Sequence, residues 1–389
     1  MKSDDRFELT EEERMLQDMV RRLAREKVAP GAEERDKKGE YPYDMLELMR
    51  ENGLMGIDFP AEYDGMAAGM LAHCIAVEEL AKADAAVALI PSCQELGSLP
   101  IILAGNHEQK EKYLKPLSTG EKVAAFGLTE AKGGSDVAAL KTRAVRKGDK
   151  YIINGSKMWI TNGGVADTYS VYAVTDPDVP AYKGASVFIM EKGMPGFSVG
   201  KPESKLGIKC SDTRELIFED VEVPVENRLG EEGQGFHIMM KTLDFSRPSV
   251  GAQALGIAAG AFEYATQYAK ERIAFGKPII KHEAIAFKLA DMAMRITAAR
   301  MLLWKTCSLL DKVAKDLSKV PPETIRHSSM TKAYCSDVAM WTTVEAVQIL
   351  GGYGYSSEYP VERMMRDAKI TQIYEGTNEI QRIVIASTL

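Results

Sequence analysis

Cysteine is scarce in this chain and follows no pattern. The five cysteines (Cys74, Cys93, Cys210, Cys307 and Cys335) are odd in number and include no C-x-x-C pair. Such spacing argues against a disulfide framework and against a thiolate zinc site. The five histidines are equally scattered, and H-E-x-x-H is absent. We therefore predict reduced thiols in the core and no metal centre.

An excess of positive charge is also missing. The 49 Lys and Arg residues are outnumbered by 56 Asp and Glu residues, which gives a net charge of −7. Without a positive field to attract a phosphate backbone, nucleic acid is not expected as a partner. Residues 1–6 lack an apolar signal region, and the most apolar later stretch, 249–266, is interrupted by Gln253 and Glu263. These absences predict no membrane insertion and a cytoplasmic location.

Common cofactor and hydrolase motifs are absent too. No G-x-G-x-x-G and no G-x-x-x-x-G-K-[ST] occurs, so neither a Rossmann fingerprint nor a P-loop is present. The segment Gly196–Gly200 (GFSVG) matches the serine-hydrolase pattern G-x-S-x-G. A nucleophile elbow requires a helix after the serine, and no helical pattern follows this segment. We interpret it as a loop.

What is present is a long, globular chain in three blocks. Its 389 residues, 45% of them hydrophobic, exceed the roughly 250–300 at which one core stops growing. Helical periodicity fills the first block, short β-branched runs fill the second, and longer helical patterns fill the third. Such segregated blocks favour an α+β multidomain fold over a doubly wound sheet. We predict an N-terminal α-helical domain (1–121), a central antiparallel, barrel-like β domain (122–238) and a C-terminal four-helix bundle (239–389).

Local patterns predict individual elements within these blocks. Thr10 to Glu13 predicts a capping box at the start of a helix that Pro30 ends. Asn154-Gly155 predicts a type I′ turn between two strands, at 151–153 and 157–160. Further strands are expected at 169–175, 185–191 and 215–223. Helices are expected at 43–52, 70–82, 109–117, 249–272, 283–310, 322–350 and 360–386.

Five polar segments stand apart from this background. They are Phe126–Asp136 (FGLTEAKGGSD), Trp159–Gly164 (WITNGG), Arg272–Pro278 (RIAFGKP), Gln348–Tyr355 (QILGGYGY) and Tyr374–Arg382 (YEGTNEIQR). Together they resemble the signatures of the acyl-CoA dehydrogenase family, of the short- or medium-chain bacterial type. The resemblance runs in the same order from the first helix to the last.

The resemblance implies a homotetrameric FAD enzyme with a carboxylate base. In this family a carboxylate removes the α-proton of an acyl-CoA while the β-hydrogen leaves as hydride to flavin N5, and Glu375 matches that base. Loss of hydration beside an acyl chain and a flavin would raise its pKa toward neutrality. The resemblance also implies electron transfer to an electron-transferring flavoprotein. Without it, Glu375 would be interpreted as an ordinary glutamate in the first turn of the last helix.

The same resemblance assigns the remaining site residues. Positions that contact the cofactor in relatives match Phe126, Leu128, Thr129, Trp159, Thr161, Arg272, Phe275, Gln348, Gly351, Gly352, Thr377 and Glu379. Positions that contact the acyl-CoA match Ser135, Asp244, Arg247, Tyr374 and Gly376. Among the cofactor positions, Gln348, Gly351 and Gly352 match contacts made across a subunit interface.

Departures from the family pattern leave some points open. Ser246 stands where some relatives carry their base, and a serine cannot act as that base. Ala131 replaces a usual proline, and Glu283 replaces a glutamine near the adenosine site, so its role is open. The acyl chain also stays open, although the polar residues and proline in 90–96 suit a short, branched or cyclic acid. Two alternatives remain: an enoyl-CoA reductase in an electron-bifurcating complex, and a catalytically silent acyl-CoA-binding homologue.

Overall fold

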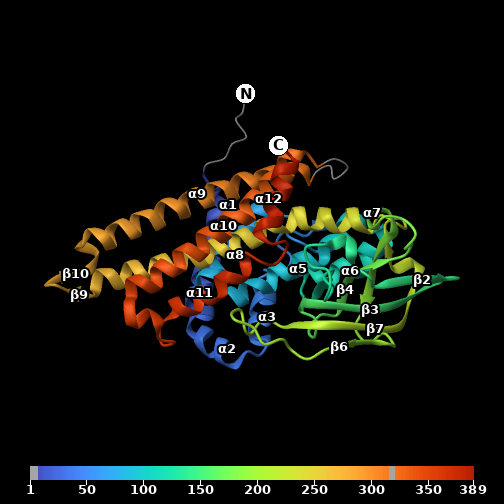
Figure 1. The fold of residues 1–389 in the computed structure, drawn as a ribbon, viewed down its shortest axis with the longest axis horizontal. Coiled ribbons are helices and arrows are strands. Elements are labelled where there is room, and N and C mark those ends of the chain that lie inside the picture. The colour runs from blue at the N-terminus through green and yellow to red at the C-terminus, as the bar shows by residue number, and fades with distance from the viewer. Residues whose placement is uncertain (1–7, 315–319) are drawn as a thin grey trace.

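The computed structural model describes residues 8–314 and 320–389, so the expectation for residues 1–6 lies outside the described chain. Helices fill the first and last parts of the described chain, and the large sheet is formed between them in sequence. Figure 1 shows the sheet at one end of the long axis and the tip of the C-terminal helices at the other. The predicted order of helical, β and helical domains is confirmed. The boundaries after residues 121 and 238 stay a prediction.

The N-terminal domain starts with the predicted capping box. Thr10 Oγ1 accepts the backbone N–H of Glu13 at 3.2 Å, and the Glu13 carboxylate accepts the N–H of Thr10 at 2.7 Å. The helices are α1 (Glu11–Leu23), α2 (Ala32–Lys38), α3 (Tyr43–Glu51), α4 (Gly69–Ala83), α5 (Ala85–Ala104) and α6 (His107–Ser118). The sequence predicted α3, α4 and α6 to within a few residues, but not α2 or the full length of α5.

Helix α5 lies at the centre of the fold. Asp84 caps its start by accepting the N–H of Ala86 at 3.0 Å. Among the described residues it is the one helix long and apolar enough to cross a membrane, but 83% of that apolar window is buried within the protein. Contacts with α4, α8 (Gly235–Glu271) and β1 (Ala124–Gly127) account for its hydrophobicity.

The central domain is built on one mixed, mainly antiparallel sheet. Its strands are β1 (Ala124–Gly127), β2 (Arg143–Lys147), β3 (Lys150–Thr161), β4 (Thr168–Val174), β5 (Ala185–Glu191), β6 (Phe197–Val199), β7 (Thr213–Pro224) and β8 (Arg228–Leu229). The order across the sheet is β6-β7-β3-β2-β4-β5-β8, and β1 pairs in parallel with β4. A short helix, α7 (Ala181–Gly184), precedes β5. The three strands predicted singly correspond to β4, β5 and β7.

The predicted hairpin at Asn154-Gly155 is wrong. Strand β3 runs straight through these residues, and the register against β7 shifts between Ile153 and Gly155. The true turn lies earlier, between β2 and β3, because Lys147 pairs with Lys150. Gly155 has φ +139°, a conformation that glycine adopts readily. This residue therefore forms part of a bulge within a long strand and not a turn.

The segment Gly196–Gly200 is a strand rather than the predicted loop. Its centre forms β6, whose Ser198 pairs with Ile217 of β7. No helix follows it, so the exclusion of a nucleophile elbow stands.

The C-terminal domain consists of long helices. These are α8 (Gly235–Glu271), α9 (Glu283–Val313), α10 (Pro322–Leu350), α11 (Pro360–Thr371) and α12 (Asn378–Ser387), with a small hairpin of β9 (Ile273–Ala274) and β10 (Lys277–Pro278). The single helix predicted over 360–386 is wrong because the chain breaks between α11 and α12. Glycines let α8 approach α4 closely: a Cβ on Gly256 would lie 2.3 Å from the carbonyl oxygen of Glu78.

All five cysteines are buried and free. Burial raises the pKa of the Cys335 thiol, and the same cause acts on Cys210. A buried thiol with a raised pKa is a poor nucleophile and packs as a small apolar group. The prediction of reduced core thiols is confirmed.

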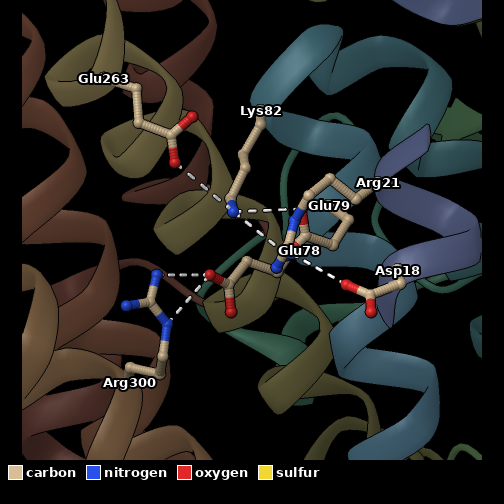
Figure 2. Close-up of polar contacts among 7 residues, drawn as sticks. All are labelled: Asp18, Arg21, Glu78, Glu79, Lys82, Glu263 and Arg300. Atoms are coloured by element: carbon tan, nitrogen blue, oxygen red, sulfur yellow. Dashed lines mark hydrogen bonds and ion pairs between the residues drawn. The ribbon is translucent and has the colours of Figure 1, made fainter. Parts of the chain in front are cut away.

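Ion pairs connect the N-terminal and C-terminal helices at the surface of α4 (Figure 2). Arg300 of α9 donates to the buried Glu78 carboxylate at 2.6 Å. The neighbouring Glu79 accepts from Arg21 of α1 at 3.0 Å and from Lys82 at 3.1 Å. Two adjacent buried carboxylates are therefore each matched by cations from other helices, which ties α1, α4 and α9 together.

Replacing Arg300 with methionine leaves the Glu78 carboxylate buried without its cation. We expect Arg300→Met to lower the free energy of unfolding by about 3 kcal/mol, measured by urea titration. Lys37→Met is the matched control, because the Lys37–Glu33 pair is exposed on both sides. An equal loss of stability in both variants would contradict the structural role of the Glu78–Arg300 pair.

Candidate active site

A cleft of about 930 Å³, here called the Glu375 cleft, opens between the sheet and the helices. Its walls come from α5, from the ends of β1 and β3, from α8, and from the connection between α11 and α12. It brings together these predicted site residues: Phe126, Leu128, Thr129, Ser135, Trp159, Thr161, Arg247, Tyr374, Glu375, Gly376 and Thr377.

Glu375 lies in the break between α11 and α12 rather than in a helix. Its φ is +53°, an uncommon left-handed conformation for a non-glycine residue, and Gly376 follows with φ +92°. Buried Lys332 of α10 donates to the Gly376 carbonyl at 2.7 Å, and Gln381 of α12 donates to the Glu375 carbonyl at 3.0 Å. Thr377 then caps α12. These bonds fix the carboxyl group in the cleft, and they rule out the interpretation of Glu375 as a first-turn helix residue.

The Glu375 carboxyl group is tuned by opposing effects. Burial raises its pKa above the ordinary value. A hydrogen bond from Ser246 Oγ to Oε2, at 2.6 Å, stabilises the ionised form, as do the charges of Arg247 and Lys332. The net direction is upward, which suits a group that accepts a proton near neutral pH.

Arg247 and Asp244 form a buried pair on α8. The Arg247 Nη1 atom donates to Asp244 at 2.7 Å and to Ser329 at 3.2 Å, and Arg247 is only 4% exposed. Burial raises the pKa of Asp244 to about 6, although Arg247 opposes this. Arg247 Nε is buried without a hydrogen-bond partner. Arg247 lines the cleft, whereas Asp244 stands behind it.

A buried lysine holds the part of the cleft wall that Leu128 and Glu130 form. Lys157 donates to the carbonyl of Leu128 at 3.1 Å and to the Glu130 carboxylate at 2.7 Å. The N–H of Met158 donates to the Thr129 carbonyl at 2.8 Å. These bonds join the two polar segments of the β domain. They also present Trp159, with φ +61° and 56% exposed, at the cleft.

Five predicted cofactor residues lie elsewhere, in a group called here the bundle tip: Arg272, Phe275, Gln348, Gly351 and Gly352. The Arg272 guanidinium lies 5.5 Å from the ring centre of Tyr353. Phe275 is 95% exposed, and a Cβ on Gly351 or Gly352 would meet nothing within 4 Å. Within one chain, the bundle tip and the Glu375 cleft are separate surfaces.

Glu379 is exposed on the first turn of α12 and does not line the cleft. The structure adds three residues that sequence reasoning did not assign a role in holding the base: Ser246, Lys332 and Gln381. Ser246 stands next to Arg247, a predicted site residue, so its position was a usable signal. Gln381 lies within the recognised segment Tyr374–Arg382, so its position was also a usable signal. Lys332 lies on an apparently ordinary helix, and only the fold brings it to the Glu375 loop.

Family models match all three of these domains and identify the class of protein. The acyl-CoA dehydrogenase N-terminal domain matches residues 10–121, the middle domain matches 125–221 and the C-terminal domain matches 233–389. The chain belongs to the acyl-CoA dehydrogenase family.

Individual relatives are similar over nearly the whole chain. The short-chain-specific acyl-CoA dehydrogenase of Clostridium acetobutylicum is 48% identical and covers 98% of this chain and 99% of its own. The butyryl-CoA dehydrogenase structure from Megasphaera elsdenii has a TM-score of 0.93 at 47% identity, covering 98% and 99%. A structure from a study of the electron-transferring flavoprotein of Acidaminococcus fermentans has a TM-score of 0.93 at 50% identity, covering 98% of each chain.

FAD is the cofactor of the family, and the Glu375 cleft fits it. An acyl-CoA dehydrogenase from Bacillus anthracis solved with FAD is 37% identical, with a TM-score of 0.90, covering 98% of this chain and 67% of its own. In the present chain a half-exposed indole, Trp159, and the β1 segment Phe126–Thr129 border the cleft. An aromatic wall of this kind suits a flat ring system.

The bond from Ser246 to Glu375 predicts a change in pH dependence. Ser246→Ala removes a donor to the ionised carboxylate, so the pKa of Glu375 rises. Because the deprotonated form is the base, the acid limb of the pH profile for flavin reduction should move up by about one pH unit. The control is Ser118→Ala, because Ser118 is also a buried serine, on α6, and its hydroxyl donates to the carbonyl of Tyr63. An unmoved acid limb in Ser246→Ala would refute this influence.

Proposed function

We propose that this enzyme dehydrogenates an acyl-CoA thioester to the 2-enoyl-CoA with Glu375 as its base. The observation that carries the proposal is the Glu375 carboxyl group, fixed in the cleft by a left-handed backbone and raised in pKa by burial. The same cleft is bordered by the family's two β-domain signatures, so base and flavin positions share one cavity. A silent acyl-CoA-binding homologue would have no need of a base held in this way.

In the proposed reaction Glu375 removes the α-proton, and its backbone N–H donates to the thioester carbonyl where negative charge develops. When bound, FAD supplies a hydride acceptor for the β-hydrogen. The hydrogen bond from Ser246 favours the ionised form of Glu375, which is the form that accepts the proton. Phe126, Leu128, Thr129, Trp159 and Thr161 border the flavin position.

Further roles follow the same proposal. The substrate's CoA portion is proposed to contact Arg247, supported by Asp244, and the cleft residues Ser135, Tyr374 and Gly376. Arg247 is suited to this because its buried Nε lacks a partner. Thr377 and Glu379 are assigned to the adenosine half of FAD, and a function for Glu283 is not proposed.

The physiological setting is proposed by similarity. We place the enzyme in the cytoplasm, in β-oxidation or a related breakdown of carboxylic acids. The electrons would pass to an electron-transferring flavoprotein, which the structure from Acidaminococcus fermentans associates with this fold. That structure belongs to a study of electron bifurcation, so it also favours a second candidate, an enoyl-CoA reductase running in reverse. The flavin midpoint potential and co-purified partner subunits distinguish the two directions.

We also propose a homotetramer in which the bundle tip of one chain completes the FAD site of another. The isolated chain leaves the bundle tip exposed, including Phe275. Helix α9 presents an exposed apolar stripe at seven-residue spacing, formed by Phe287, Met294 and Met301. Such a stripe is typical of a helix that packs against another copy.

The base assignment is tested by Glu375→Gln, which keeps the shape of the side chain but removes its basicity. This variant should retain FAD and bind acyl-CoA, yet its flavin should lose colour under anaerobic substrate addition at least about a thousandfold more slowly. Stopped-flow absorbance measures the rate. Rapid bleaching by the variant would contradict the assignment of Glu375 as the base. A colourless wild-type protein would favour a catalytically silent acyl-CoA-binding homologue.

The assembly is tested by placing a charge in the α9 stripe. Met294→Asp should reduce the particle below four chains and weaken FAD retention, because the interface would bury the new carboxylate. Light scattering coupled to gel filtration measures the mass. Met15→Asp, at an exposed methionine of α1, is the control. A Met294→Asp variant that keeps both the wild-type mass and its FAD would refute this interface.

A further inference from the structure

A buried polar group, called here the polar cluster, lies beside the Glu375 cleft and has no part in the reaction described above. It consists of Asp58, His73 from α4 and Glu95 from α5. His73 Nε2 lies 3.1 Å from Glu95 Oε2, and Nδ1 lies 3.6 Å from Asp58 Oδ1. Each ring nitrogen therefore faces a carboxyl group, an arrangement that favours a bridging imidazolium.

A buried cluster of charged side chains is not expected to stabilise the fold more than apolar side chains would. His73 is 1% exposed and Glu95 is 0% exposed. Burial by itself would lower the pKa of His73, but Glu95 and Asp58 raise it well above its ordinary value. Replacing buried ionic groups by apolar ones is often neutral or stabilising, so a cluster of this kind points to a function.

Two serines connect the polar cluster to the cleft. His73 Nε2 lies 3.0 Å from Ser249 Oγ, and Ser249 donates to Ser92 Oγ at 3.0 Å. Ser92 of α5 and Ser249 of α8 both line the Glu375 cleft. The cluster thus ends in two hydroxyl groups at the cleft wall.

The existing hydrogen bonds of the two serines determine which ligand groups they can bind. The Ser249 hydroxyl donates its hydrogen bond to Ser92 Oγ, and the Ser92 hydroxyl donates to the carbonyl of Ala88 at 3.0 Å. A serine hydroxyl has one proton and two lone pairs, so both serines keep acceptor capacity but have no proton to give. Neighbouring Gln253 donates one of its two amide protons to Ala85 and accepts from Tyr374. A ligand group that bonds to the two serines must therefore donate.

Charge narrows the ligand further. The one cation in the polar cluster, His73, already faces two carboxyl groups. A carboxylate on the ligand would be repelled by this cluster and would bring only acceptors to serines that need a donor. A neutral hydroxyl group meets both requirements.

The position along α8 indicates where the hydroxyl belongs on the substrate. Ser246, which holds Glu375, and Ser249 are three residues apart on the same helix. That spacing corresponds to about 4.5 Å along the helix axis. The ligand hydroxyl would thus sit a few carbon atoms beyond the carbon that loses its proton, toward the end of a short chain.

We propose that Ser92 and Ser249, oriented by the polar cluster, form a specificity site for an acyl-CoA with a hydroxyl near the end of a short acyl chain. This inference rests on the proposed function, because it concerns the substrate of the same cleft. Ser249 and Ser92 contact the substrate hydroxyl, while His73, Glu95 and Asp58 are positioning residues that hold the serine protons away from the cleft.

The test compares matched substrates on the FAD-loaded enzyme. Five- and six-carbon ω-hydroxyacyl-CoAs are each compared with the acyl-CoA that carries a methyl in place of the hydroxyl, and with the corresponding dicarboxylic monothioester. The wild type should favour one hydroxyacyl-CoA over its methyl partner by roughly tenfold in kcat/KM, and the dicarboxylic thioester should be the poorest. Equal rates, or preference for the methyl or carboxylate partner, would overturn the proposal.

Variants separate this site from the reaction itself. Ser249→Ala, and independently Ser92→Ala, should abolish the preference for the hydroxyl while retaining turnover of the methyl partner. Ser118→Ala should keep the preference. A preference that survives in both cleft variants contradicts the specificity site and leaves the dehydrogenase proposal intact. A wild type that oxidises none of the thioesters contradicts the dehydrogenase proposal instead.

Discussion

Glu375 has a backbone conformation that few non-glycine residues adopt, and the rest of the site depends on how it is held there. Lys332 and Gln381 bind the carbonyls of Gly376 and Glu375 from two separate helices. Both helices are anchored by their own packing, so the loop between α11 and α12 has little freedom. A continuous helix would turn this carboxyl group away from its present setting and remove the bond to Ser246.

The residues around the Glu375 loop also set the electrostatics of the cleft. Burial raises the pKa of Glu375, whereas Ser246, Arg247 and Lys332 stabilise its charge. Lys332 is itself buried, which lowers its pKa to about 7, and Glu375 opposes that shift. Arg247 is matched by Asp244. The carboxyl group therefore sits among charges that already have other partners, and its basicity is adjusted without a direct ion pair that would block the proton.

Sequence reasoning succeeded where the signal was local. The capping box at Thr10 and the long helical periods of the third block predicted helices well, and contiguous motifs contained most of the predicted site residues that the cleft brings together. It failed where distant pairing decided the outcome. Asn154-Gly155 has the composition of a turn, but pairing with β7 keeps it inside a strand. The Ser246–Glu375 bond joins residues 129 apart, and no periodicity reveals such a contact.

In the proposed reaction Glu375 exchanges a proton with the α-carbon of a bound acyl-CoA. This exchange is measured by incubating the FAD-loaded enzyme anaerobically with butyryl-CoA in D₂O and determining deuterium at C2 by mass spectrometry. We expect incorporation by the wild type and none above background by Glu375→Gln. Equal incorporation by both proteins would contradict the role of Glu375 as the base.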